Sequence, residues 1–208
     1  MRLLWPALQG TGLPVWVLGI ASYLVVWVPL LGAVLVASFA RGRRSLRQDF
    51  GLRFRWIDLL LGLGIGLGLR FVAGLLELVT GGTLVLAPTE FEPLWFALIV
   101  VAPVLIAPWI EELFFRGLTL RALERSMRGV ASRAGRAALA VLVSALLFSA
   151  VHLLEQPLDA WPRVAAINLV VGAVLAVVAL RTGRLGAPII AHIVFNATAV
   201  VPALMAMR

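Results

Sequence analysis

The chain has 208 residues, of which 62% are hydrophobic and only 13% charged, and its mean hydropathy is +1.04. A soluble domain is about half apolar and about a quarter charged, so this composition excludes an ordinary soluble protein and indicates a polytopic membrane protein. The net charge of +8 is carried by arginine alone, in short loops between apolar runs, which favours positive-inside placement over nucleic-acid binding. Cysteine is absent, which excludes disulfides, thiolate catalysis and thiolate metal ligands.

Six apolar segments predict an all-α transmembrane helical bundle, because each is close to the ~20 residues that cross about 30 Å of hydrocarbon. They are 13–40, 57–80, 94–120, 137–154, 163–180 and 187–206. The first segment exceeds the hydrophobic length of a signal peptide, so we expect it to span the membrane. We expect one membrane domain over 1–208, with two spans and an outer loop in 1–93 and the catalytic core in 94–206.

The connectors alternate between arginine-rich and acid-bearing sequences. Arginines gather in 41–56, 121–136 and 181–186, whereas 81–93 and 155–162 contain four acids and no arginine. Basic loops tend to remain in the cytoplasm, so the three basic connectors are predicted to be cytoplasmic and both termini to lie outside. Arginine-only usage suggests a GC-rich bacterial genome, and hence a protein of the plasma membrane.

The second segment combines a glycine stripe with two charges. In 61-LGLGIGLGL-69 the glycines recur at every second residue, and no strand pattern or following lysine supports a phosphate loop, so close helix packing is favoured. The segments 57–80 and 137–154 are both rich in such small residues. Arg70 and Glu77 lie two turns apart on nearly the same face, which predicts a structural ion pair. The alternative is that Arg70 binds the carboxyl end of a substrate.

Charged side chains at bilayer depth cost from about 2.5 kcal/mol upward, so they usually face the bundle interior and mark function. In 107-APWIEELFFRG-117, Glu112 and Arg116 are i,i+4 with the acid first, the favoured order for an ion pair. Glu111 lies about 100° around the helix and has Phe115 at i+4. Two carboxylates in different environments can separate an orienting acid from a general base. The alternative is a structural ion-pair cluster, although the second acid leaves a surplus buried charge.

Two further pairs share helix faces, Phe148 with His152 and His192 with Asn196. An imidazole and an amide side by side can present two donors to one oxygen, as an oxyanion site requires. The alternative for each pair is interhelical hydrogen bonding worth about 1 kcal/mol. Together with Glu111, these residues supply the base, proton relay and donor pair of a water-activating amide hydrolase. A further uncharged polar residue inside the membrane is Asn168.

A serine nucleophile is less attractive. Ser144 and Ser149 flank His152, but small serines are common in helix packing, and neither lies in a nucleophile elbow.

Three motifs occur in order on successive apolar segments: EExxxR at 111–116, FxxxH at 148–152 and HxxxN at 192–196. This pattern resembles the CAAX-protease and bacteriocin-processing (CPBP) family of intramembrane endopeptidases, which includes the type II CAAX prenyl endopeptidases. The match covers roughly 94–200, about half of the chain. The first two segments lie outside it.

The resemblance implies that Glu111 activates water together with His152. It also implies that Glu112 and Arg116 orient and balance that carboxylate. The reaction would then be hydrolysis of a peptide bond without a covalent acyl-enzyme.

The resemblance further implies that His192 and Asn196 hold the scissile carbonyl as its oxyanion develops. Phe148 is a weaker candidate for contact with the substrate, as is Arg70. The expected partners are the lipid bilayer and a peptide or membrane-protein substrate, lipidated in some relatives; no nucleic acid is expected.

Zinc is the mechanistic alternative, since members of the family have been described as metalloproteases. Its ligands would be Glu111, His152 and His192. The chain lacks HExxH, and adjacent glutamates on a helix diverge, so no cofactor is favoured. Two other function classes remain open: an ion-coupled transporter, and a non-catalytic scaffold or immunity factor. Against transport, the chain is short and shows no inverted repeat.

One observation conflicts with a single site. Counting ~1.5 Å per residue from the predicted cytoplasmic ends puts Glu111 about 14 Å deep, His152 about 22 Å and His192 about 9 Å. We expect kinks at Pro103 and Pro108, tilt or shifted boundaries to level these residues near mid-membrane.

Overall fold

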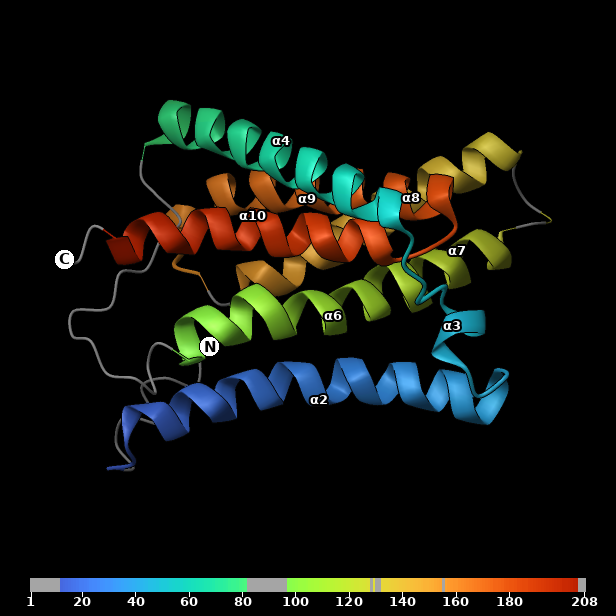
Figure 1. Cartoon of the computed structure of the whole chain (residues 1–208), viewed down its shortest axis with the longest axis horizontal. Coiled ribbons are helices and arrows are strands. Elements are labelled where there is room, and N and C mark those ends of the chain that lie inside the picture. Colours follow the sequence, from blue (N-terminus) through green and yellow to red (C-terminus); the bar gives the residue numbers. More distant parts are fainter. Residues whose placement is uncertain (1–11, 82–96, 128, 130–131, 155, 206–208) are drawn as a thin grey trace.

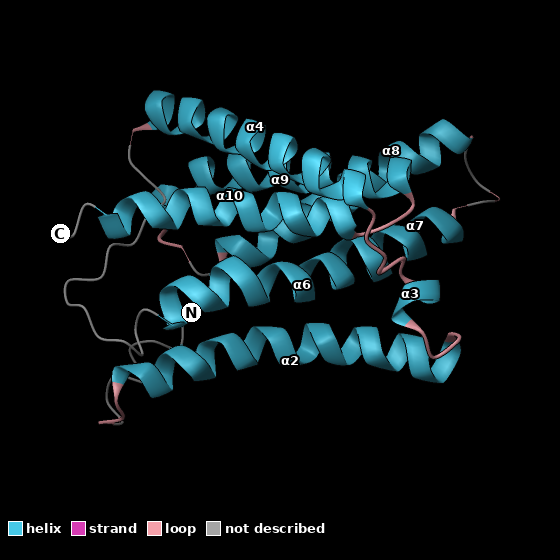
Figure 2. Ribbon diagram, in the orientation of Figure 1, coloured by secondary structure: helices cyan, strands magenta, loops and turns pink. Residues whose placement is uncertain are grey.

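The computed structural model describes residues 12–81, 97–127, 129, 132–154 and 156–205. Every element in these residues is a helix and none is a strand (Figure 2), which confirms the predicted all-α fold. The long helices are α2 (Val15–Arg41), α4 (Trp56–Thr80), α8 (Arg133–Leu153), α9 (Trp161–Thr182) and α10 (Gly186–Met205). One continuous rod joins η1 (Ala97–Ile106), α6 (Ala107–Glu112), η2 (Leu113–Thr119) and α7 (Leu120–Ser126). The short helices are α3 (Leu46–Asp49) and η3 (Leu158–Ala160).

Within the described residues, four helical stretches are long and apolar enough to cross a membrane. They are Trp16–Arg41, Trp56–Thr80, Arg133–Leu153 and Leu158–Thr182, and Gly186–Val200 is a shorter apolar helix. Large apolar side chains such as Leu78 and Val79 point outward from these helices, 80% and 83% exposed. Apolar surface of this kind suits hydrocarbon, not water, so the fold is a helical membrane bundle.

At the arginine-rich end, two helix boundaries differ most from those expected. The third segment continues past residue 120 to Ser126, because 120–126 is composed largely of good helix formers. Helix α8 begins at Arg133 instead of 137, because the Ser132 side chain caps it by accepting a 3.1 Å hydrogen bond from the N–H of Gly135.

The basic connectors meet at one end of the bundle (Figure 1). The N–H of Leu185 donates to the carbonyl of Gly51 at 2.9 Å, which ties the last connector to the first. Arg184 forms a 2.8 Å ion pair with Asp58, a carboxylate that is fully buried at the start of α4. The alternation of basic and acidic connectors predicted that the basic connectors share one end of the bundle. The side of the membrane that they face stays a prediction.

Alternate glycines of α4 let it pack tightly along α10. A Cβ on Gly62 would lie 2.5 Å from the Ile190 side chain, and one on Gly66 would lie 2.6 Å from the Ala191 carbonyl oxygen. A Cβ on Gly64 or Gly68 would meet nothing within 4 Å. The predicted role in packing is therefore confirmed for one face of the stripe, since residues four apart share a face of a helix and residues two apart do not.

Small residues also let α8 and α9 pack closely. A Cβ on Gly172 would lie 3.0 Å from the Cα of Ala145, so the two backbones are in close contact. Ser144 donates to the Phe115 carbonyl at 3.0 Å, and Ser149 to the Ala165 carbonyl at 3.3 Å. Both serines thus make hydrogen bonds to the backbone of neighbouring helices, as expected of packing residues.

Candidate active site

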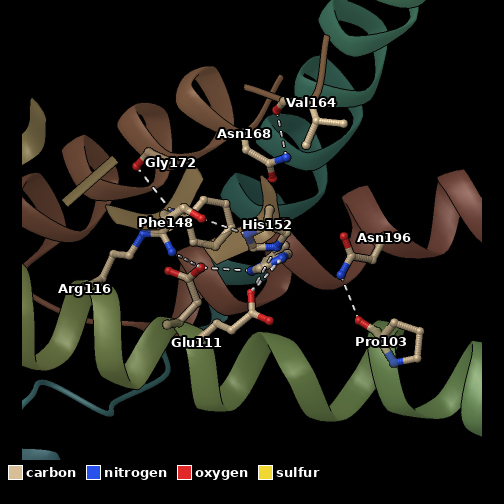
Figure 3. A network of polar contacts seen from close by, with 11 residues as sticks. Pro103, Glu111, Arg116, Phe148, His152, Val164, Asn168, Gly172 and Asn196 are labelled. Carbon is tan, nitrogen blue, oxygen red and sulfur yellow. Dashed lines mark hydrogen bonds and ion pairs between the residues drawn. The ribbon is translucent and has the colours of Figure 1, made fainter. Parts of the chain in front are cut away.

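A cluster of ionisable side chains lies where three helical elements meet (Figure 3). The long rod contributes Glu111, Glu112 and Arg116, the end of α8 contributes His152, and the first half of α10 contributes His192. Glu112 and Arg116 have no exposed surface, and His192 is 3% exposed. An apolar cluster that includes Phe115, Phe148, Val171 and Phe195 surrounds them.

Glu112 is the centre of the buried part of this cluster. Its Oε1 lies 2.9 Å from Nη1 of Arg116, so the predicted i,i+4 ion pair is confirmed. The same oxygen lies 3.0 Å from Nδ1 of His192, across 80 positions of sequence. Local spacing gave no signal for this second contact, because nothing in a helical repeat shows which distant helix packs on a given face.

Glu111 faces both histidines. Its Oε2 lies 3.8 Å from Nε2 of His152 and 3.8 Å from Nε2 of His192. These distances are longer than a direct hydrogen bond, and they place one carboxylate oxygen and two imidazole nitrogens around a common point. The structure therefore brings together Glu111, His152 and His192, which lie in three separate sequence motifs.

The hydrogen bonds at Nδ1 define how the two imidazoles are oriented. Nδ1 of His152 lies 2.8 Å from the Phe148 carbonyl oxygen, and that oxygen can only accept. Nδ1 of His192 likewise faces the Glu112 carboxylate. Both Nδ1 atoms therefore carry the proton, and both Nε2 atoms are directed at Glu111.

The Phe148 ring lies beneath the polar groups. It is 1% exposed, with the Arg116 guanidinium 4.3 Å from its centroid and the His152 ring centroid at 4.4 Å. Arg116 also donates from Nη2 to the Gly172 carbonyl at 3.4 Å. Phe148 thus supports the histidines and the arginine from the core side, and the substrate contact predicted for it has little exposed ring to use.

Asn196 forms a separate hydrogen bond to the rod, at Pro103 of η1. Its Nδ2 donates to the Pro103 carbonyl at 2.8 Å, and Figure 3 shows this amide turned toward Pro103. In the π-helical η1 that carbonyl would accept from residue 108, which is a proline and has no N–H. The predicted pair with His192 is therefore only partly assembled. One amide N–H is committed to Pro103, and the second remains for another acceptor.

Two further polar groups lie outside the cluster. Arg70 forms an ion pair with Glu77, as predicted, and its guanidinium stacks over the Phe195 ring at 5.9 Å from the centroid. Asn168 of α9 donates to the Val164 carbonyl at 2.9 Å within its own helix.

The expected difference in depth is resolved by staggered helix ends. Figure 1 shows that α7 and the start of α8 project beyond the start of α10. An end-by-end count of residues therefore overstates the separation of His192 from the other two residues. Glu111, His152 and His192 lie at one depth, where Glu111 is 3.8 Å from both histidines.

The arrangement of the donor side chains differs from that of a metal site. Among the described residues, no group of three or more His, Cys, Asp or Glu side chains has the arrangement to hold one. Zinc requires each ligand atom at about 2.0–2.2 Å. Glu112, the remaining carboxylate, is committed to Arg116 and His192.

Comparison with known proteins identifies the family. Residues 93–198 match the family model described as type II CAAX prenyl endopeptidase Rce1-like. No curated protein and no solved structure matches the chain. The matched range contains all three motifs and begins next to the predicted core boundary at 94. Since it covers half of the chain, this membrane protein belongs to the Rce1-like family of type II CAAX prenyl endopeptidases, which are protein hydrolases.

Proposed function

We propose that the chain is an intramembrane endopeptidase that cleaves a membrane-associated peptide or protein with a water molecule activated by Glu111 and His152. The observation that carries the proposal is the pair of 3.8 Å distances from Glu111 Oε2 to Nε2 of His152 and of His192. A water molecule can lie ~2.8 Å from Glu111 Oε2 and ~2.8 Å from a histidine Nε2 at the same time, because two such hydrogen bonds can bridge atoms that are 3.8 Å apart. The His152 side chain is 31% exposed, so this side of the cluster is open at the surface of the helix bundle.

In the proposed reaction, Glu111 removes a proton from the water as the oxygen attacks the scissile carbonyl carbon. The carbonyl becomes a tetrahedral oxyanion, with the proton held on Glu111 or passed to Nε2 of His152. Collapse of this intermediate breaks the C–N bond, and the same proton is delivered to the leaving amine. General acid–base assistance of this kind is worth about 10²–10⁴-fold in rate.

We propose that His192 stabilises the oxyanion, which the charge balance of the cluster supports. Two carboxylates against one guanidinium leave a net charge of −1, which one imidazolium would cancel. A protonated His192, held at Nδ1 by Glu112, would present an N–H from Nε2 to the oxyanion. The second N–H of Asn196, one turn further along α10, is the proposed companion donor.

The mechanism is proposed to operate without a metal ion. Its support is that, among the described residues, no group of three or more His, Cys, Asp or Glu side chains is arranged to hold a metal ion. Zinc held by Glu111, His152 and His192 is the competing prediction, and a chelator separates the two.

The family suggests a substrate class to propose. Because its description is that of a CAAX prenyl endopeptidase, prenylated C-terminal CAAX peptides are the first substrates to examine. Unmodified membrane peptides form the second class, in keeping with the bacterial origin that arginine-only usage suggests.

The test is cleavage by the purified chain in detergent, comparing wild type with Glu111→Gln, with and without a chelator. Prenylated and unprenylated forms of the same peptides are assayed side by side. We expect cleavage that survives the chelator and falls at least about 10²-fold in Glu111→Gln. Loss in the chelator that added zinc restores would assign the reaction to metal. Equal cleavage by both proteins would reject Glu111 as the base. Cleavage by neither would favour a non-catalytic scaffold.

A further inference from the structure

A polar cleft lies at the arginine-rich end of the bundle, separate from the catalytic cluster. It is an open cleft of about 640 Å³ between the end of α2, α3 and the rod at η2 and α7. We call it the basic cleft and define it by Arg41, Arg43, Gln48 and Arg125 on its polar side and Ala37 and Leu118 on its apolar side. None of these residues contributes to the proposed reaction.

The charges of the basic cleft are unbalanced. Three guanidiniums, those of Arg41, Arg43 and Arg125, face a single carboxylate, Asp49, which leaves a net charge of +2. All three arginines are exposed, and within the described part of the chain none of their guanidiniums takes part in an ion pair. They are therefore available to an external anion.

The one carboxylate is already occupied by internal donors. Asp49 accepts from the Ser38 hydroxyl at 2.6 Å, from the N–H of Arg43 at 3.0 Å and from the N–H of Ser45 at 3.3 Å. These bonds hold the pKa of Asp49 below its usual value, chiefly through the hydroxyl. Its charge thus orders the loop that carries Arg43.

The conformation of this loop leaves no space for a side chain at position 42. A Cβ on Gly42 would lie 2.6 Å from Asp49 Oδ2 and 2.7 Å from the Ser38 carbonyl oxygen, and Arg44 has a φ of 57°. The basic cleft is therefore built before a ligand arrives. A ligand that binds a preformed site avoids the entropy cost of ordering it.

The position of the cleft indicates where its anion comes from. It opens at the level where α2, a membrane-length apolar helix, ends in Arg41. Just below this level, Val36 and Phe39 of α2 are exposed, as lipid-facing side chains are. Arginine pairs with phosphate through a planar fork of donors, and basic pockets at helix ends bind anionic lipid headgroups.

We propose that the basic cleft binds the phosphate of an anionic glycerophospholipid, whose acyl chains lie along the exposed face of α2. Arg41, Arg43 and Arg125 bind the phosphate, and Ala37 and Leu118 contact the glycerol end of the chains. The proposal is independent of peptide cleavage.

The test is native mass spectrometry of the full chain in detergent, titrated with dioleoyl phosphatidylglycerol or dioleoyl phosphatidylcholine. We expect one phosphatidylglycerol to bind in preference to phosphatidylcholine. The triple variant Arg41→Gln, Arg43→Gln, Arg125→Gln should weaken this binding about 100-fold, at roughly a factor of five per arginine. The matched control removes three exposed arginines outside the cleft, Arg47→Gln, Arg133→Gln and Arg181→Gln, and should change it less than about threefold.

A second variant keeps all charges and blocks the space. Gln48→Trp fills the basic cleft and should weaken phosphatidylglycerol binding as the triple variant does. Equal weakening in the two triple variants would overturn the proposal in favour of net charge alone. Unchanged binding in Gln48→Trp would place the lipid elsewhere. Competition by glycerol 3-phosphate at the concentration of the lipid would reassign the cleft to a soluble phosphate.

Discussion

Glu112 and His192 are joined by a 3.0 Å hydrogen bond, although they are 80 positions apart in the chain. The same carboxylate oxygen also forms an ion pair with Arg116. One buried oxygen thus links the rod to α10, and Arg116 of the same rod balances its charge. Glu112 is therefore a positioning residue. It fixes the orientation of the His192 ring and so directs Nε2 toward Glu111.

The first prediction concerns the stability that depends on Glu112. Glu112→Ala leaves the Arg116 guanidinium buried without its carboxylate, and breaking a buried pair in this way costs about 3–5 kcal/mol. We expect the free energy of unfolding, measured by circular dichroism in mixed micelles, to fall by this amount. Arg116→Met added to Glu112→Ala should recover part of the loss.

Glu111→Gln is the matched comparison, because it is nearly isosteric and keeps a polar group at the neighbouring position. It should abolish cleavage and change the free energy of unfolding by less than about 1 kcal/mol, as volume-conserving changes do. The same loss of stability in Glu111→Gln as in Glu112→Ala would show that both carboxylates are structural.

The second prediction uses the two faces of the α4 glycine stripe. Gly66→Ala places a methyl group 2.6 Å from the Ala191 carbonyl oxygen, next to His192, so α10 must shift. We expect a lower thermal midpoint in detergent and a loss of peptide cleavage. Gly68→Ala meets open space and should leave the midpoint unchanged or raise it, since alanine favours a helix by about 1 kcal/mol over glycine. Equal effects at both positions would contradict the packing described here.

The third prediction separates the two roles open to Arg70. If it pairs only with Glu77, then Arg70→Gln and Glu77→Gln should destabilise the protein by similar amounts, and the double variant should cost less than their sum. KM for a peptide substrate should stay unchanged in all three. A raised KM in Arg70→Gln, with no change in Glu77→Gln, would instead assign Arg70 to the substrate carboxylate.

The fourth prediction concerns the pH dependence of thermal stability that Asp49 causes, in a connector outside the membrane-spanning helices. The Ser38 hydroxyl and the N–H groups of Arg43 and Ser45 lower the pKa of Asp49 from its usual 3.8. A carboxyl group with a lowered folded pKa stabilises the fold fully above its unfolded pKa, and this contribution is lost as the pH falls through the folded value. The thermal midpoint of wild type should therefore exceed that of Asp49→Asn at pH 6. The difference should shrink below pH ~4. A constant difference from pH 6 to pH 3 would disprove the linkage.

Local spacing predicted the contacts that lie within one helix and missed most of those between helices. The pairs Glu112–Arg116 and Arg70–Glu77 follow from helical periodicity, and both form. The hydrogen bonds of Asn196 to Pro103 and of His192 to Glu112 depend on how far α10 slides along the rod. No repeat in the sequence records that offset.

The depths predicted for Glu111, His152 and His192 were wrong for a related reason. They assumed that every helix ends at the same level, whereas the helix of the third segment runs on to Ser126 and α10 starts inside the bundle. Motif order nevertheless identified the residues that meet, because Glu111, His152 and His192 are three of the few ionisable groups in apolar segments.

The rod that carries both glutamates changes its winding three times, from η1 to α6, from α6 to η2 and from η2 to α7. Six residues of ordinary α-helix, Ala107–Glu112, lie between the π-helical stretches η1 and η2. A π-turn contains about one more residue than an α-turn, so removing one of the residues 104–106, which follow Pro103 in η1, would rotate the part of the rod before it by about 100°. Glu111 and Glu112 would keep their places, but the Pro103 carbonyl would turn away from Asn196. The number of residues in this rod, and not only their side chains, is therefore a constraint on any loop graft or deletion made in this protein.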